Sequence, residues 1–288
     1  METNILKAII NIKNLNEYDL NKIYPPKSEM VIENRIQNVG RGLETFIKDA
    51  FSNSFDKIDK INYYSKYFSY TGNPNNPPDS MIKNGDAIEV KKNKNPNSQI
   101  QLNSSFPKNK FYAHDPLITE KCISCEQWQQ KDMLYAIGII EDKKTHIESL
   151  ALIYGDCFAA DETVYLKIKN KLVDTIKNIP DSEKTNELGR INRVDPLGVT
   201  KLRIRGMWLL ENPYKIFNNI FKYDSNKQLF SLISLMTKSK FNSFPNKDKK
   251  AILKDEEIIV KEVKIQDPNN PVDQIEAIYI RFDVKWVN

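Results

Sequence analysis

Asp79, Glu89 and Lys91 are the side chains of this sequence whose types and spacing best suit joint chemistry. They flank Asn84-Gly85, a strong turn signal between short apolar runs, which predicts a β-hairpin. We expect a three-residue loop at Lys83-Asn84-Gly85, whose glycine supplies the left-handed residue. Asp79 then lies directly opposite Glu89, and Lys91 returns to the same face two residues later. The spacing therefore predicts one strand face that carries two carboxylates and a lysine.

Two facing carboxylates suit a hard divalent cation such as Mg²⁺, which prefers oxygen ligands and keeps several waters. A lysine beside that cation can orient or deprotonate an attacking water, and it can offset charge that builds on a phosphate. Two carboxylates with a bound cation and a lysine favour hydrolysis of a phosphodiester. An ordinary surface hairpin with solvated charges is the alternative. The nuclease interpretation is favoured by an apolar second face, formed by Ile82, Ile88 and Val90.

The segment also resembles a known family. Pro78-Asp79, followed after nine residues by Glu89-Val90-Lys91, is similar to the PD-(D/E)xK nuclease motif, and the wider string 76–92 resembles the NgoPII-like type II restriction endonucleases. Two later strings, 101–105 and 202–208, look similar to that group as well. The short motif is degenerate, whereas the longer strings are much more specific, and the resemblance extends from about residue 34 to about residue 213.

This resemblance implies Mg²⁺-dependent cleavage of double-stranded DNA at a short palindrome, with a GC-rich site such as GGCC. It implies that Asp79 and Glu89 hold the metal, with the Val90 carbonyl as a further ligand, and that Lys91 positions or activates water. In this superfamily a glutamate from an N-terminal helix often joins the metal site, which makes Glu44 the candidate here. A solvated helix glutamate is the alternative for Glu44. A palindromic target would require a two-fold homodimer, because protein symmetry mirrors site symmetry.

Arg203 and Arg205 are the main candidates for contact with DNA. They alternate with apolar residues and so share one face of a predicted strand over 198–208. Arginine can form a bidentate pair with guanine in the major groove, and it also binds phosphate without reading sequence. A strand whose arginines pair with surface carboxylates is the alternative. The other candidate DNA contacts are Arg41, Lys92, Gln101, Asn103, Ser104, Ser105 and Lys108.

Composition sets broad limits. The chain has 288 residues, 40% hydrophobic and 28% charged, with a formal net charge of +5. A mildly basic balance is compatible with a polyanionic partner. Three cysteines make a disulfide framework unexpected and fit a reducing bacterial cytoplasm, and no apolar run is long enough for a membrane span. Cys122, Cys125 and His114 could form a zinc site, although structural zinc normally takes two close ligand pairs and buried free thiols are the default.

The predicted elements suggest an α/β fold with a mixed sheet flanked by helices, as in a PD-(D/E)xK core. We expect a single nuclease domain over 1–288, with a catalytic core at about 33–180 and recognition elements at about 181–288. Apolar periodicity predicts helices over 33–52 and 165–179 and strands over 132–140, 148–155 and 275–287. Residues 181–194 are expected to form a loop. The basic run 238–254 is interpreted as a solvated face.

Two other functions remain open from these residues. A repair or junction nuclease could use the same metal site on a DNA structure rather than on a defined sequence. A DNA-binding protein that does not cut would have no need of the carboxylates and the lysine.

Overall fold

A computed structural model describes residues 2–15, 35–141, 147–223 and 228–285, with the side chains of 35–41, 228, 229 and 285 left undescribed. The helix expected over 33–52 corresponds to α3 (Arg35–Ser52), and the start of the prediction lies outside the described residues. Within the described helices, none is long and apolar enough to cross a membrane.

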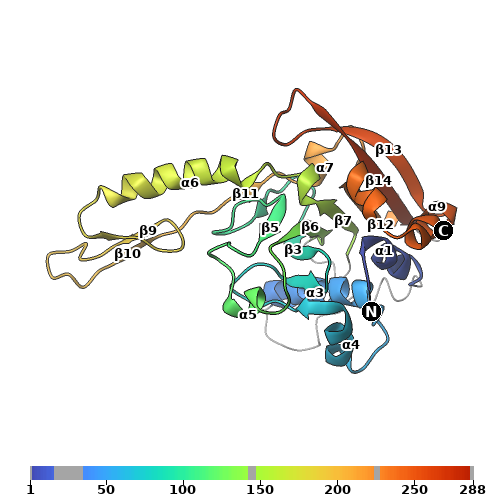
Figure 1. The fold of residues 1–288 in the computed structure, drawn as a ribbon, viewed down its shortest axis with the longest axis horizontal. Coiled ribbons are helices and arrows are strands. Elements are labelled where there is room, and N and C mark those ends of the chain that lie inside the picture. Colours follow the sequence, from blue (N-terminus) through green and yellow to red (C-terminus); the bar gives the residue numbers. More distant parts are fainter. Residues whose placement is uncertain (1, 16–34, 142–146, 224–227, 286–288) are drawn as a thin grey trace.

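A nine-stranded mixed sheet forms the body of the molecule (Figure 1). Its strands follow the order β1-β2-β3-β6-β7-β12-β14-β13, and β5 pairs with β6 beside this path. Strand β3 runs parallel to β6 and β7 runs parallel to β12, while the other neighbours are antiparallel. The strands are β1 (Phe68–Tyr70), β2 (Ser80–Ile82), β3 (Ala87–Asn93), β5 (Lys110–Tyr112), β6 (Gln130–Ile139), β7 (Ser149–Tyr154), β12 (Gln228–Thr237), β13 (Ile259–Gln266) and β14 (Gln274–Lys285).

The central strands are apolar on both sides because both faces of the sheet are covered. Along β6, Leu134 and Ala136 point into one hydrophobic cluster, and Tyr135 and Ile137 point into the other. The two clusters form cores on opposite sides of the sheet, which confirms the expected α/β class and is consistent with a restriction-endonuclease-like fold.

Helices cover the first face. The buried apolar residues of α1 (Ile5–Lys13), α3, α8 (Lys238–Ser243) and α9 (Asn246–Lys254) belong to its cluster. Gly138 on β6 allows α3 to lie close, because a Cβ there would come within 2.8 Å of a Leu43 methyl carbon. The short helix α4 (Lys60–Tyr67) leads into β1 at the edge of this layer.

Shorter elements cover the second face. They are α5 (Glu120–Ile123), the 3₁₀ turn η2 (Gly155–Cys157), α7 (Pro213–Ile216) and a two-stranded sheet of β4 (Ile100–Gln101) and β11 (Leu209–Leu210). Strand β4 is only two residues long, although Leu102 and Trp208 continue its backbone pairing with β11.

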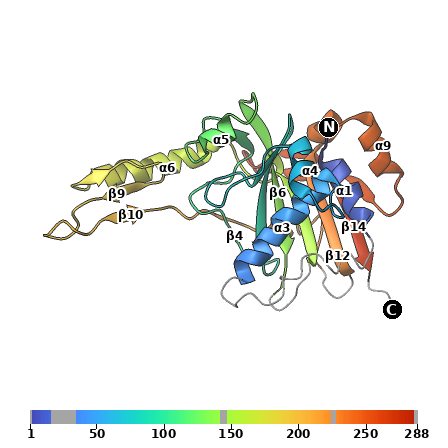
Figure 2. The same cartoon turned by 90° about the horizontal axis from the view of Figure 1, so that it is seen from below.

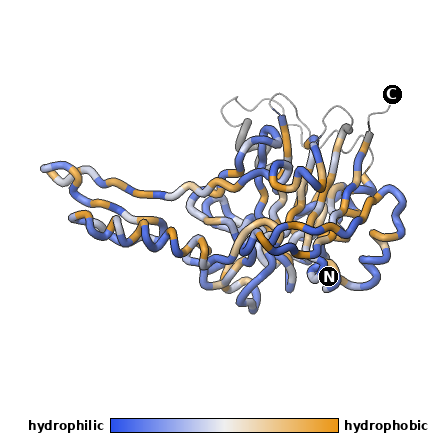
Figure 3. Tube along the Cα trace, turned by 90° about the horizontal axis from the view of Figure 1, so that it is seen from above, coloured by the Kyte–Doolittle hydropathy of each residue, from blue (hydrophilic) through white to orange (hydrophobic). Residues whose placement is uncertain are grey.

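An extension projects from the body (Figures 1 and 2). It consists of α6 (Glu162–Lys177) and a three-stranded antiparallel sheet of β8 (Ser182–Glu183), β9 (Gly189–Ile191) and β10 (Leu202–Ile204). The expected loop over 181–194 was therefore wrong in part, because it contains β8 and β9, which pair with each other, and β9 also pairs with β10. Hydrophobic and hydrophilic residues alternate along this extension (Figure 3), and α6 has no fully buried side chain.

The C-terminal part of the chain completes the body. Strand β14 confirms the strand expected over 275–287, although residues 286 and 287 of the prediction lie outside the described part. Strands β12, β13 and β14 belong to the same sheet as β3, so the body draws strands from both halves of the chain.

A buried charge network anchors the start of β3 to the helical layer. Lys240 on α8 makes ion pairs with Asp86 and Asp132, and Asp86 also accepts a hydrogen bond from the Tyr154 hydroxyl. Lys110 adds a second cation on Asp132. Burial lowers the pKa of Lys240, but the two carboxylates outweigh it and raise that pKa overall. The expectation that the basic run 238–254 forms a solvated face was therefore wrong at Lys240.

We predict that Lys240→Met lowers the free energy of unfolding by about 3 kcal/mol, because Asp86 and Asp132 lose the cation that offsets their burial. Urea unfolding followed by circular dichroism measures the change. Lys250→Met is the matched control, since Lys250 is an exposed lysine of the same basic run, and it should alter stability by no more than about 0.5 kcal/mol. Equal unfolding free energies for the two variants would contradict a structural role for Lys240.

Candidate active site

The hairpin has the predicted register. Ser80 pairs with Ile88 and Met81 with Ala87, so extending the pairing by one residue sets Asp79 opposite Glu89. The predicted three-residue loop is confirmed by the backbone amide of Ile82, which donates to the carbonyl of Asp86 at 2.9 Å.

The identity of the left-handed loop residue was predicted wrongly. Asn84 has φ of 53°, whereas Gly85 does not have positive φ. Asparagine tolerates this conformation because its short polar side chain can hydrogen-bond locally. Gly85 is needed for space instead, since a Cβ there would come within 2.9 Å of the Ile82 side chain.

A buried ion pair from the next strand holds the loop. The Lys131 ammonium donates to the carbonyls of Ile82 and Gly85 at 3.1 and 2.8 Å. Glu126, which forms an ion pair with Lys131, accepts a hydrogen bond from the Asn84 amide at 3.0 Å. The register of the hairpin is thus determined by its neighbours as well as by its turn.

The two carboxylates and the lysine meet as predicted. The Val90 amide donates to Asp79 Oδ2 at 2.6 Å, and Lys91 Nζ lies 2.6 Å from Glu89 Oε1. The Glu89 and Lys91 side chains are mostly covered, and Glu89 Oε2 is buried without a hydrogen-bond partner. An orphaned carboxylate oxygen is costly unless another positive group satisfies it.

The electrostatics of the cluster favour an additional cation. Burial raises the pKa of Asp79 to about 8, and repulsion from Glu89 adds to this effect, while Lys91 opposes it. Burial lowers the pKa of Lys91, but Glu89 and Asp79 outweigh burial, so the net shift is upward and the lysine is charged. A divalent cation would relieve the repulsion and satisfy Glu89, and an all-oxygen donor set fits Mg²⁺.

A metal here would depend on water and substrate for its remaining ligands. In the described part of the chain, no group of three or more His, Cys, Asp or Glu side chains is arranged to hold a metal ion. Two carboxylates are nevertheless enough for Mg²⁺ when phosphate completes the coordination. The Val90 side chain is buried in the core, and its carbonyl as a ligand stays a prediction.

Glu44 approaches the cluster from α3. Its charge contributes to raising the pKa of both Asp79 and Lys91, so its carboxylate lies within electrostatic reach of them. The helix is held in place by Leu43, which packs over Gly138. A direct role of Glu44 at the metal stays a prediction.

A cavity of about 530 Å³ joins the cluster to the predicted DNA contacts. Its walls come from the hairpin, the loop after β4, and the base of the extension. The sequence candidates that line it are Asp79, Glu89, Lys91, Asn103, Ser104, Ser105, Arg203 and Arg205. The fold thus brings together residues that are more than a hundred positions apart in the sequence.

Other candidates lie outside this cavity. Lys108 is buried and forms an ion pair with Asp115, so its expected phosphate contact was wrong: the ammonium is already neutralised and covered. Gln101 is exposed and pairs with Leu209, and Lys92 alternates to the opposite face of β3 from Lys91. The side chain of Arg41 lies outside the described residues.

Glu187 is a charged cavity residue that sequence reasoning missed. It follows β8 and is buried, with 8% of its side chain exposed. Its carboxylate accepts hydrogen bonds from Arg203 Nε at 2.7 Å and Ser104 Oγ at 2.8 Å, and it pairs with Arg205 Nε at 2.8 Å. The two arginines therefore share one face as predicted, and both pair with a carboxylate, but that carboxylate is buried in the cavity wall. No local signal distinguishes a glutamate in this polar segment.

The CxxC pair does not form a zinc site with His114 in the described residues. Cys122 is buried with its sulfur 3.9 Å from that of Met81, and Cys125 donates to the Cys122 carbonyl. His114 is exposed and stacks on Tyr112. All three cysteines are free of disulfides; Cys122 and Cys157 are buried, and Cys125 is partly exposed.

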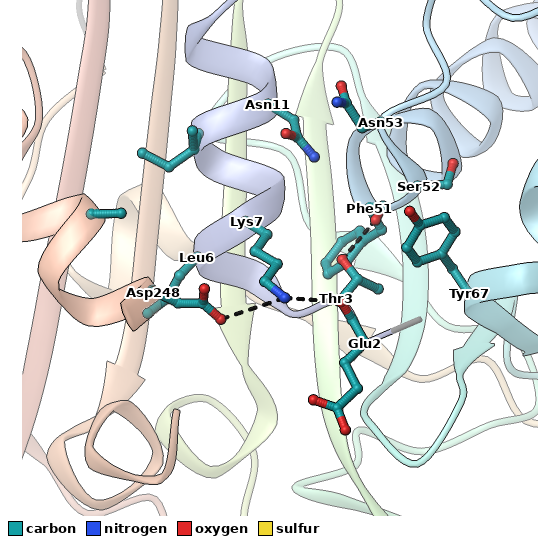
Figure 4. Close-up of a pocket in the computed structure, with 12 residues that line it drawn as sticks. Glu2, Thr3, Leu6, Lys7, Asn11, Phe51, Ser52, Asn53, Tyr67 and Asp248 are labelled. Atoms are coloured by element: carbon teal, nitrogen blue, oxygen red, sulfur yellow. Dashed lines mark hydrogen bonds and ion pairs between the residues drawn. The ribbon is translucent and has the colours of Figure 1, made fainter. Parts of the chain in front are cut away.

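A second cavity, of about 460 Å³, lies between α1, α3 and α9 (Figure 4). Within it, Lys7 lies 3.8 Å from Asp248 and donates to the backbone carbonyl of Glu2, and Thr3 donates to the Phe51 carbonyl. The carboxylates of Glu2 and Asp248 do not face each other in Figure 4, unlike Asp79 and Glu89, so the first cavity is the better candidate for catalysis.

Gly72 allows the backbone to pass behind Asp79. It has φ of +84°, and a Cβ would lie 2.3 Å from the Asp79 carbonyl oxygen. Only glycine fits both the conformation and the close approach.

Comparison with known proteins gives two matches. Residues 3–266 match the family described as NgoPII restriction endonuclease. The chain is 42% identical over 272 residues to the type II restriction enzyme NgoPII of Neisseria gonorrhoeae, an alignment that covers 93% of this chain and 95% of the relative. No solved structure matches the chain significantly.

We predict that Gly72→Ala lowers the free energy of unfolding by about 2 kcal/mol or more, because it combines left-handed strain with a backbone clash. Urea unfolding measures the loss. Gly206→Ala is the matched control, since a Cβ there meets only Leu188 and Trp208 at 3.6 Å or more. Similar losses in both variants would show that Asp79 is not held by this close approach.

Proposed function

Because the chain belongs to the NgoPII restriction endonuclease family, we propose that it hydrolyses phosphodiester bonds of double-stranded DNA at a short palindromic site in a Mg²⁺-dependent reaction. Membership makes it a type II restriction enzyme, a site-specific deoxyribonuclease. A GC-rich, GGCC-like site is the sequence that the family resemblance favours. The observation that carries the proposal is the single cavity that holds Asp79, Glu89 and Lys91 beside Arg203 and Arg205.

The chemistry rests on the carboxylate pair. Asp79 and Glu89 would hold Mg²⁺, with the Val90 carbonyl as a further ligand and Glu44 as an assisting carboxylate. When bound, the metal supplies Lewis-acid stabilisation of the phosphate and lowers the pKa of a coordinated water. The buried, unpaired Oε2 of Glu89 supports this assignment.

Lys91 serves best as a charged group. Its raised pKa keeps the ammonium protonated beside Glu89. It therefore orients the attacking water and offsets negative charge on the scissile phosphate. The sequence left open whether Lys91 orients or deprotonates the water, and a charged ammonium favours orientation.

DNA would lie along the cavity, with the extension beside it. Asn103, Ser104 and Ser105 face the same space as the arginines and suit contacts with phosphate or bases. We retain a single nuclease domain over 1–288. Recognition elements were expected after residue 180. Within that part of the chain, the segment with β8, β9 and β10 supplies residues that line the cavity.

The assembly and setting follow from the substrate. Cutting both strands of a palindrome calls for a homodimer with two copies of the site. The bacterial cytoplasm is where such an enzyme meets invading DNA, as part of a restriction-modification system.

The first test is digestion of phage λ DNA by the purified chain with Mg²⁺, and with EDTA as the metal-free control, followed by sequencing of the fragment ends. We expect discrete ends that share one short palindrome, and no cutting with EDTA. A smear would indicate a structure-directed or nonspecific nuclease instead. Binding without cutting in any of several divalent metals would indicate a DNA-binding protein.

We predict that Lys91→Ala slows cleavage by roughly 10²-fold or more, because the transition state loses a charged group in a covered site. Binding of the site duplex in Ca²⁺ should change by only a few-fold. Lys83→Ala, on the exposed loop of the same hairpin, should cleave like the wild type. Full activity of the Lys91 variant in single-turnover assays would remove this lysine from the mechanism.

A further inference from the structure

Glu187 connects two parts of the cavity wall that are distant in sequence. The Ser104 hydroxyl comes from the loop after β4, 83 residues earlier in the chain. Arg203 and Arg205 come from β10 and the residue after it. The two carboxylate oxygens of Glu187 contact three donor side chains and so connect the base of the extension to the body.

The charge of Glu187 is secure near neutral pH. Burial alone would raise its pKa, but hydrogen bonds from Ser104 and Arg203 and the charges of both arginines outweigh burial and lower it. One anion between two guanidinium groups leaves a net positive charge on this cluster. The cluster therefore remains attractive to a polyanion such as DNA.

The orientation in which Glu187 holds the two arginines is more informative about DNA recognition than their charge. Each pairs with Glu187 through Nε, while 64% of the Arg203 side chain and 56% of the Arg205 side chain remain exposed. A guanidinium has five N–H donors, so a bond at Nε leaves the terminal nitrogens with donors to spare. A planar fork that is already oriented loses less freedom on binding a base edge or a phosphate.

Resting on the proposed function, we propose that Glu187 is a positioning residue for DNA recognition, which holds Arg203 and Arg205 side by side so that their terminal nitrogens contact the bases of the target site. It does not touch the reacting atoms. Its effect is on discrimination between sites rather than on the chemical step, because the arginines and not the metal cluster depend on it.

The test uses the full-length chain and the site that fragment-end sequencing of phage λ DNA defines. Two duplexes are compared, one with that site and one with a single base pair changed within it. Glu187→Gln keeps the size of the side chain but removes the charge and one acceptor oxygen. Glu183→Gln is the matched control, because Glu183 is an exposed glutamate on β8 that lies 3.8 Å from Arg190, outside the cavity.

We expect Glu187→Gln to reduce the ratio of kcat/KM between the two duplexes at least tenfold. KM for the correct site should rise, and kcat should stay within about threefold of the wild type. Glu183→Gln should leave the ratio unchanged. The positioning role would be overturned by an unchanged ratio for Glu187→Gln or by an equal loss of kcat/KM on both duplexes. Tighter binding of both duplexes would also overturn it, because Glu187 would then mask the arginines.

A second variant separates orientation from folding. The double substitution Arg203→Lys with Arg205→Lys keeps Glu187 and the charges but removes the planar forks. It should lose discrimination as Glu187→Gln does, with a thermal unfolding curve like that of the wild type. Retained discrimination would overturn the inference. Failure of the wild type to cut phage DNA would instead refute the proposed function itself, so the two failures are distinguishable.

Discussion

The structure of the site depends on one electrostatic constraint, the close approach of Asp79 and Glu89. Burial, together with repulsion from Glu89, raises the pKa of Asp79 to about 8. The hairpin register, the Val90 amide and the Lys91 ammonium hold the pair together. The rest of the fold can be understood as support for this arrangement, which leaves a carboxylate oxygen ready for a cation.

That support comes from the sheet on one side and the extension on the other. Lys240 and Lys131 anchor the hairpin by ion pairs that would be costly to break once buried. The extension has little core of its own, yet Glu187 fixes its base to the loop after β4. The proposed catalytic and recognition groups therefore share one cavity.

Several sequence-based errors share a physical origin. Lys108 was interpreted as a DNA contact and Lys240 as part of a solvated face, but each forms an ion pair with a carboxylate from another segment. Strands β8 and β9 were missed because strands of two and three residues have no periodicity to detect. They form by pairing with each other, and β9 also pairs with β10. The left-handed conformation was assigned to Gly85 because glycine adopts it most readily, but Asn84 adopts it instead. Glycine is needed at position 85 because the Ile82 side chain leaves no space for a Cβ.

The sequence by itself determined the hairpin register, the facing carboxylates, the lysine and the α/β class, because turn chemistry and apolar alternation act over a few residues. It also carried the family resemblance in strings around 76–92, 101–105 and 202–208. Only the tertiary structure decided that these strings line one cavity and that Glu187 binds both arginines. Such contacts join residues far apart in the chain, and their partners are selected by the packing of the whole sheet rather than by any local pattern.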